Sequence, residues 1–137
     1  MNRMSPGLRW ALLVTDIVFL LYWSVSLLAL LHVISLPPEM MYDGYDQPRV
    51  IAWNWSFLPL DVGFSVTGLL AVAADRRGDP SWVALALLSL AFTTAAGGMA
   101  IGYWIILQEF DPGWFIPNLL IFLWPFLFLP GLIRQVR

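Results

Sequence analysis

Four long apolar runs constrain this chain more than any other feature of its sequence. A helix needs about 20 residues to cross the hydrocarbon core of a bilayer, and each run reaches that length. None of the runs alternates, and four strands could not close a barrel, so helices are predicted. The sequence therefore predicts an all-α fold, an integral membrane four-helix bundle in a single domain over residues 1–137. The predicted helices are Trp10–Ser35, Val50–Ala74, Trp82–Leu107 and Trp114–Ile133.

Composition narrows the classes of partner. The chain is 60% hydrophobic and 12% charged, about half the charge density of a soluble domain. A net charge of -2 with no basic stripe argues against nucleic acid as a partner. Cysteine is absent and His32 is the one histidine, so neither a thiolate site nor a histidine metal site is expected. We therefore expect the lipid bilayer as the main partner, with no metal and no cofactor.

The arginines predict the orientation in the membrane. Six of the seven arginines lie before the first run, between the second and third, or after the fourth. Cytoplasmic loops carry an excess of Lys and Arg, so both termini and the Asp75–Pro80 turn are expected in the cytoplasm. Most tryptophans then fall near a membrane edge, where aromatic residues are enriched. Those expected at the outer edge are Trp53, Trp55, Trp104 and Trp114.

Two aspartates interrupt the apolar runs. A carboxylate at the centre of a membrane helix costs roughly 2.5 to 3.5 kcal/mol on insertion scales, so such residues mark functional sites. Asp61 shares one face of its helix with Asn54, Ser65 and Gly68, because these positions are three or four residues apart. Pro59 lies within this face and is expected to kink the helix there. Asp16 lies in the first run, one to two turns nearer the cytoplasm.

Other polar and aromatic side chains are predicted at similar depths. Tyr22 reaches the depth of Asp61, and Trp23 and Trp124 fall inside the core, where they line a cavity or pack the bundle. The candidates for acid–base chemistry are Asp61 and Asp16. The full set predicted to bind a ligand is Asp61, Asn54, Tyr22, Trp23, Asp16, Ser65, Asn118 and Trp124.

Small residues in the third run suggest close helix packing. Gly98 and Gly102 form the small-xxx-small spacing that lets membrane helices approach one another. Three interpretations remain open: packing within the bundle, a homo-oligomer face, or backbone that lines a pocket.

One stretch resembles a known family. It reads Ala52-Trp53-Asn54-Trp55-Ser56-Phe57-Leu58-Pro59-Leu60-Asp61, accompanied by Thr15-Asp16-x-x-Phe19-x-x-Tyr22-Trp23 and Pro37-Pro38-Glu39. These segments resemble the YvaD-like family of small bacterial membrane proteins. The resemblance implies four helices over most of the chain and a bacterial cytoplasmic (inner) membrane location, and it implies no activity.

Three functions fit the sequence. The first is a protein that binds or translocates a small lipophilic or cationic ligand, or protons, at Asp61. The second is a membrane-embedded acid–base enzyme that acts on a lipid-soluble, isoprenoid-like substrate. The third is a structural or accessory membrane subunit, in which the polar face only holds helices together. No catalytic motif separates these alternatives.

Overall fold

Helix α1 begins where the side chain of Ser5 accepts a hydrogen bond from the amide of Leu8, at 3.3 Å. The computed structural model describes residues 3–136, and this part of the chain contains helices and no strands. Four segments of it are long and apolar enough to cross a membrane: Pro6–Leu30, Pro48–Arg77, Trp82–Leu107 and Pro112–Gln135. The helices are α1 (Pro6–Leu30), α2 (Pro48–Ser56), α3 (Leu58–Arg77), α4 (Trp82–Leu107), α5 (Pro112–Leu123) and α6 (Leu129–Gln135), with 3₁₀ turns η1 (Pro38–Met40) and η2 (Trp124–Leu127).

The bounds of the third span are those predicted, whereas the first span differs. Helix α1 ends at Leu30, five residues before the predicted Ser35. His32 adopts a left-handed φ of 57°, and the amide of Val33 turns back to bond the carbonyl of Leu28 at 2.9 Å. The apolar run therefore extends beyond the helix, because the backbone leaves the helical conformation before the Pro37-Pro38 pair.

Prolines divide the second and fourth spans, which were predicted as single helices. The second is broken at Phe57, two residues before the predicted kink at Pro59. A proline fits the first turn of a helix, where its missing N–H needs no partner, so α3 starts afresh at Leu58. In the fourth span, Pro125 and Pro130 start the η2 turn and α6 in the same way.

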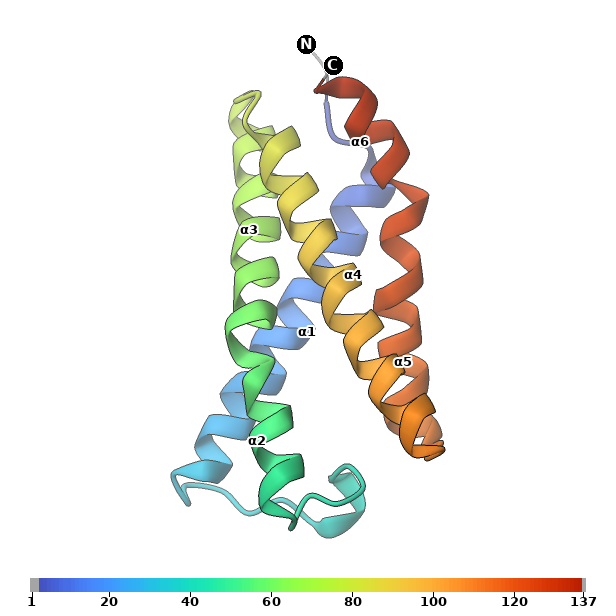
Figure 1. Ribbon diagram of the computed structural model, residues 1–137. Coiled ribbons are helices and arrows are strands. Elements are labelled where there is room, and N and C mark those ends of the chain that lie inside the picture. The colour runs from blue at the N-terminus through green and yellow to red at the C-terminus, as the bar shows by residue number, and fades with distance from the viewer. Residues whose placement is uncertain (1–2, 137) are drawn as a thin grey trace.

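Helix α4 lies at the centre of the arrangement. It packs against α3 on one side and α5 on the other, while α1 packs against α3 (Figure 1). The start of α1, the α3–α4 turn and the end of α6 lie together, and we call this the arginine end. The opposite end, which holds the loop 31–47 and the α4–α5 turn, is the loop end. Toward the loop end, α1 and α2 diverge from α4 and α5 (Figure 1).

The two halves of the core differ in composition. Aliphatic side chains such as Leu8, Leu12 and Leu90 fill the arginine end. Aromatic side chains, among them Trp23 and Phe64, fill the half toward the loop end. A cavity lies in this aromatic half.

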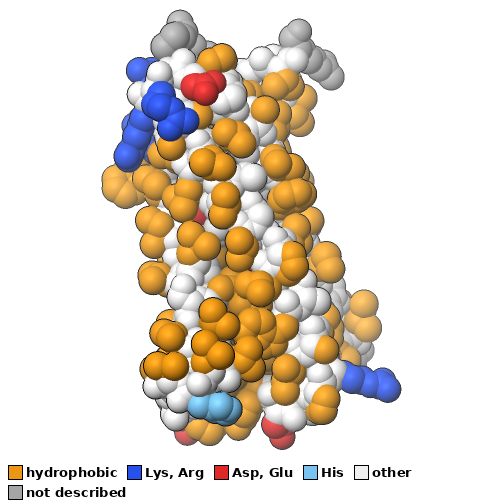
Figure 2. Space-filling view, turned by 90° about the vertical axis from the view of Figure 1, so that its left-hand side faces the viewer, with side chains coloured by type: hydrophobic (Ala, Val, Ile, Leu, Met, Phe, Trp, Pro, Cys, Tyr) orange, Lys and Arg blue, Asp and Glu red, His pale blue; other side chains and the backbone are white. Residues whose placement is uncertain are grey.

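The surface matches a membrane-embedded body. Only 17% of the most apolar window of α1 is buried inside the protein, against 44% for α4. Figure 2 shows hydrophobic side chains along the body of the molecule, with most charged groups near its two ends. An exposed apolar band of this kind is what lipid would cover.

Candidate ligand-binding cavity

Helices α1 and α3 run antiparallel and meet in a regular register, which we call the α1–α3 seam. Contacts recur every seven residues on each helix, a spacing of two turns or about 10 Å. The three pairs that define the seam are Arg9 with Asp75, Asp16 with Gly68, and Trp23 with Asp61. Each layer contains one buried aspartate, and each aspartate meets a different environment.

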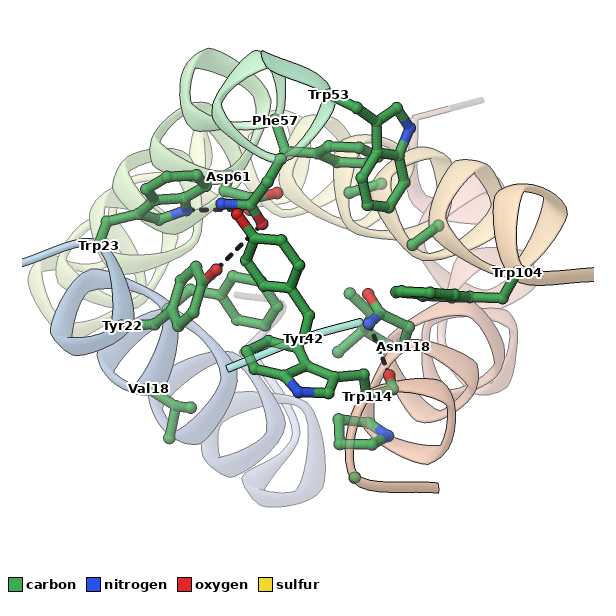
Figure 3. Close-up of a pocket in the computed structure, with 17 residues that line it drawn as sticks. Val18, Tyr22, Trp23, Tyr42, Trp53, Phe57, Asp61, Trp104, Trp114 and Asn118 are labelled. Carbon is green, nitrogen blue, oxygen red and sulfur yellow. Dashed lines mark hydrogen bonds between the residues drawn. The ribbon is translucent and has the colours of Figure 1, made fainter. Parts of the chain in front are cut away.

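Asp61 occupies the layer nearest the loop end. Its side chain is 4% exposed, and its Oδ2 atom accepts a hydrogen bond from the indole N–H of Trp23 at 2.9 Å. The other oxygen, Oδ1, has no hydrogen-bond partner among residues 3–136. Asp61 also lines a cavity (Figure 3).

The cavity has a volume of about 180 Å³ and lies where the helices diverge. Residues of α1 to α5 line it together with Tyr42 from the loop 31–47, and Asp61 carries the one formal charge among these lining residues. Burial raises the pKa of the Tyr42 phenol, so this group stays neutral. Eight of the 17 residues that line the cavity are aromatic: Phe19, Tyr22, Trp23, Tyr42, Trp53, Phe57, Trp104 and Trp114.

Edge-to-face contacts hold these rings in place. The rings of Tyr42 and Trp114 meet at 90° with their centroids 5.6 Å apart. Tyr22 contacts Trp114 across the cavity at 6.0 Å, and Trp53 stacks on Tyr103 at 3.9 Å. Such pairs fix ring orientation and add about 0.5 to 1.5 kcal/mol each beyond area burial. The cavity is therefore built from mutually braced rings.

Two asparagines add polar groups to the wall. The hydroxyl of Tyr22 and Oδ1 of Asn54 form a hydrogen bond of 3.1 Å. Asn118 donates from Nδ2 to the carbonyl of Trp114, one turn earlier in α5, at 2.7 Å. A carbonyl can only accept, so this contact fixes the orientation of the Asn118 amide.

Five of the eight residues predicted to bind a ligand meet at this cavity: Asp61, Asn54, Tyr22, Trp23 and Asn118. The other three, Asp16, Ser65 and Trp124, lie outside its lining. Trp124 packs against the aliphatic cluster of the arginine end instead. That any of the eight binds a ligand stays a prediction.

Asp16 occupies the middle layer of the seam. It is fully buried, and neither carboxyl oxygen has a hydrogen-bond partner among residues 3–136. Its carboxyl group lies against the backbone of Gly68, in the space that a side chain there would take. Ser65 is also fully buried on the same face of α3, and its hydroxyl has no partner in the described chain.

Asp75, in the third layer, was not predicted as a site residue. Its Oδ2 accepts from the Arg9 guanidinium at 2.6 Å, and its Oδ1 accepts from the amide of Met4 at 2.9 Å. The Arg3 guanidinium donates to the backbone carbonyl of the same residue. Because these contacts join the start of α1 to the end of α3, Asp75 closes the seam at the arginine end.

Sequence reasoning also missed six rings of the cavity wall: Phe19, Tyr42, Trp53, Phe57, Trp104 and Trp114. Trp53, Trp104 and Trp114 were expected at the outer membrane edge, which stays a prediction. Their second role follows from the divergence of the helices, which no single run of sequence reveals. Among the described residues, no group of three or more His, Cys, Asp or Glu could hold a metal ion.

The profile of a family described as "Family of unknown function (DUF5360)" matches residues 8–137. The chain belongs to the DUF5360 family. A relative in Bacillus subtilis (strain 168), printed as "Uncharacterized protein YvaD", is 37% identical over 125 residues, which cover 91% of this chain and 90% of the relative. The resemblance to YvaD-like proteins is thereby confirmed, and this relative is bacterial. No solved structure matches the chain.

Proposed function

We propose that this protein resides in a membrane and binds a small lipophilic cation in the aromatic cavity, with Asp61 as its counter-ion. The observation that carries the proposal is the Asp61 carboxyl group, the one formally charged group among the described residues that line the cavity, with the Trp23 indole as its hydrogen-bond donor. A cation bound there would meet both a carboxylate and the faces of tryptophan and tyrosine rings. Such faces attract cations by about 2 kcal/mol or more where water is excluded.

The size of the cavity limits the ligand. An apolar cavity of about 150 Å³ holds one benzene molecule. The present cavity, at about 180 Å³, would therefore take one ring together with a small ammonium group. Since its lining is mostly apolar, the ligand's carbon skeleton would bury against rings while its charge sits at Asp61.

Two further proposals concern the setting of this site. We place both termini in the cytoplasm of a bacterium and the cavity in the outer half of the inner membrane, because arginines gather at the other end.

A homo-oligomer through Gly98 and Gly102 is the second proposal. A Cβ at Gly98 would meet the Phe122 ring of the same chain at 3.1 Å, whereas Gly102 has nothing within 4 Å. A partner helix would therefore approach at Gly102.

Calorimetric titration of protein in lipid nanodiscs tests the binding proposal, with empty nanodiscs subtracted. The probe is phenyltrimethylammonium, and its neutral isostere tert-butylbenzene is the matched control. We expect the cation to bind at least about tenfold more tightly than the isostere, because only the cation gains the contact with the carboxylate. Asp61→Asn should remove this difference, whereas Asp46→Asn in the exposed loop should preserve it.

The two other functions give different results in the same experiment. Equal binding of both probes by wild type and Asp61→Asn would rule out the counter-ion role of Asp61. An accessory subunit predicts that Asp61→Asn and Asp61→Leu both fold and bind neither probe, like wild type. An enzyme predicts that a lipid copurified with wild-type protein is turned over and that Asp61→Asn stops the turnover. Uptake into proteoliposomes then separates a carrier from a binding protein.

A further inference from the structure

The amide of Asn118 presents an accessible acceptor to the cavity. Its Nδ2 atom is committed to the Trp114 carbonyl at 2.7 Å, so Oδ1 is the atom left over. No hydrogen bond to this oxygen is found among residues 3–136, where the side chain bonds only through Nδ2. Asn118 lines the cavity, so this acceptor is available to a bound molecule.

Asn118 and Asp61 lie on opposite walls. Asp61 projects from α3 and Asn118 from α5, with the open space between them (Figure 3). Contacts with α4 show where each residue lies along that helix. A Cβ at Gly63 would lie 3.6 Å from the Phe92 ring, and a Cβ at Gly97 would lie 2.8 Å from the backbone carbonyl oxygen of Asn118.

The segments that carry the two polar groups contact different turns of α4. Gly63, two residues after Asp61, faces the Phe92 ring, whereas the backbone of Asn118 contacts Gly97, which is more than one turn nearer the loop end. Asn118 therefore lies nearer the loop end than Asp61, in addition to the width of the cavity. A molecule that reaches both must be elongated.

We propose that the ligand class is an aromatic amine with a hydrogen-bond donor, such as a hydroxyl group, at the end remote from the ammonium group. This inference rests on the proposed function and adds a second recognition point to it. The ammonium group pairs with the Asp61 carboxyl group, the ring packs against Tyr22 and Trp114, and the distal hydroxyl donates to Oδ1 of Asn118. A ligand that lacks the distal donor leaves Oδ1 of Asn118 without a hydrogen-bond partner, so that ligand binds less tightly.

Two amines that differ only in this group test the inference. Tyramine carries a para hydroxyl, and phenethylamine is the same molecule without it. We expect calorimetry in nanodiscs to show tyramine binding about fivefold more tightly than phenethylamine, as one net hydrogen bond implies. In Asn118→Leu the preference should fall to about one, with phenethylamine affinity kept within about twofold.

Gln47→Leu is the control, because it removes an exposed amide that does not line the cavity and should keep the preference for tyramine. The inference is overturned if wild type binds the two amines equally, or if the preference survives Asn118→Leu. In both cases an Asp61-dependent affinity for phenethylamine would leave the proposed function standing. If neither amine binds, or if both bind equally well to Asp61→Asn, the proposed function fails as well. Circular dichroism of each variant verifies that it is folded.

Discussion

The carboxyl group of Asp16 fills the notch that the missing side chain of Gly68 leaves on α3. A Cβ added at Gly68 would overlap Asp16 and would also lie 2.8 Å from the hydroxyl oxygen of Ser89 on α4. The glycine thus allows three helices to meet around a fully buried acid. In the adjoining layers the aspartates have partners, an arginine for Asp75 and an indole for Asp61.

Gly68→Ala should therefore destabilise the protein. Alanine favours a helix by about 1 kcal/mol over glycine, but overpacking at a filled site costs about 1 to 3 kcal/mol. We expect a net loss for Gly68→Ala and a gain for Gly131→Ala in α6, where no atom lies within 4 Å. SDS-induced unfolding of the detergent-solubilised variants measures both. Equal stability of the two variants would contradict the close contact between Asp16 and Gly68.

Trp23→Phe should cost about 1 to 3 kcal/mol, because it leaves both oxygens of the buried Asp61 carboxyl without a donor. In the Asp61→Leu background the same replacement should cost less than about 1 kcal/mol, since only packing is lost. Trp55→Phe is the control: its ring lies 5.2 Å from that of Trp23, and no hydrogen bond links it to Asp61 in the described chain. If the double-mutant cycle shows no coupling energy between Trp23 and Asp61, the hydrogen bond from the indole N–H contributes nothing to stability.

Sequence patterns predicted the helices better than their ends. The third span was predicted at its observed bounds, because Gly78, at a φ of 72°, ends α3 sharply and the turn to Trp82 is short. The end of α1 was missed because a left-handed residue, His32, stops the helix within an apolar run. Hydropathy measures affinity for lipid and is blind to backbone conformation.

The candidate site was predictable along each helix and not between helices. Helical spacing predicted Asn54, Asp61 and Ser65 on one face of a single helix. The break at Phe57 instead puts Asn54 on α2, and only Asn54 and Asp61 line the cavity. The register of α1 against α3 depends on side-chain packing, so the opposition of Asp16 to Gly68 could not be read from either segment alone. Asp75 was not predicted as a buried contact residue, because it precedes two exposed arginines and resembles an ordinary turn residue.

Arg9→Met should weaken the arginine end by about 1 to 2 kcal/mol. Methionine keeps an apolar stem but removes the guanidinium that reaches Asp75 at 2.6 Å, so a fully buried carboxylate loses a charged donor. The loss is moderate because the Arg9 side chain is 36% exposed and the amide of Met4 still bonds to the carboxylate. Unfolding in SDS measures the change, and Arg76→Met, at an exposed position, is the control.

The role of charge in this pair can be isolated with Asp75→Asn. In that background the further replacement Arg9→Met should cost almost nothing, because no buried charge remains to be compensated. An unchanged cost would mean that Arg9 stabilises the protein through its aliphatic stem alone.

Membrane orientation can be tested with two matched substitutions, because the natural chain contains no cysteine. Ser35→Cys and Ser81→Cys each replace one exposed serine by its near isostere, at the loop end and the arginine end respectively. With the arginine end in the cytoplasm, a membrane-impermeant maleimide applied to intact spheroplasts should label Ser35→Cys and leave Ser81→Cys unlabelled. After permeabilisation both should react, which shows that each thiol is accessible. Labelling of Ser81→Cys alone in intact spheroplasts would reverse the orientation, and the cavity would then open toward the cytoplasm.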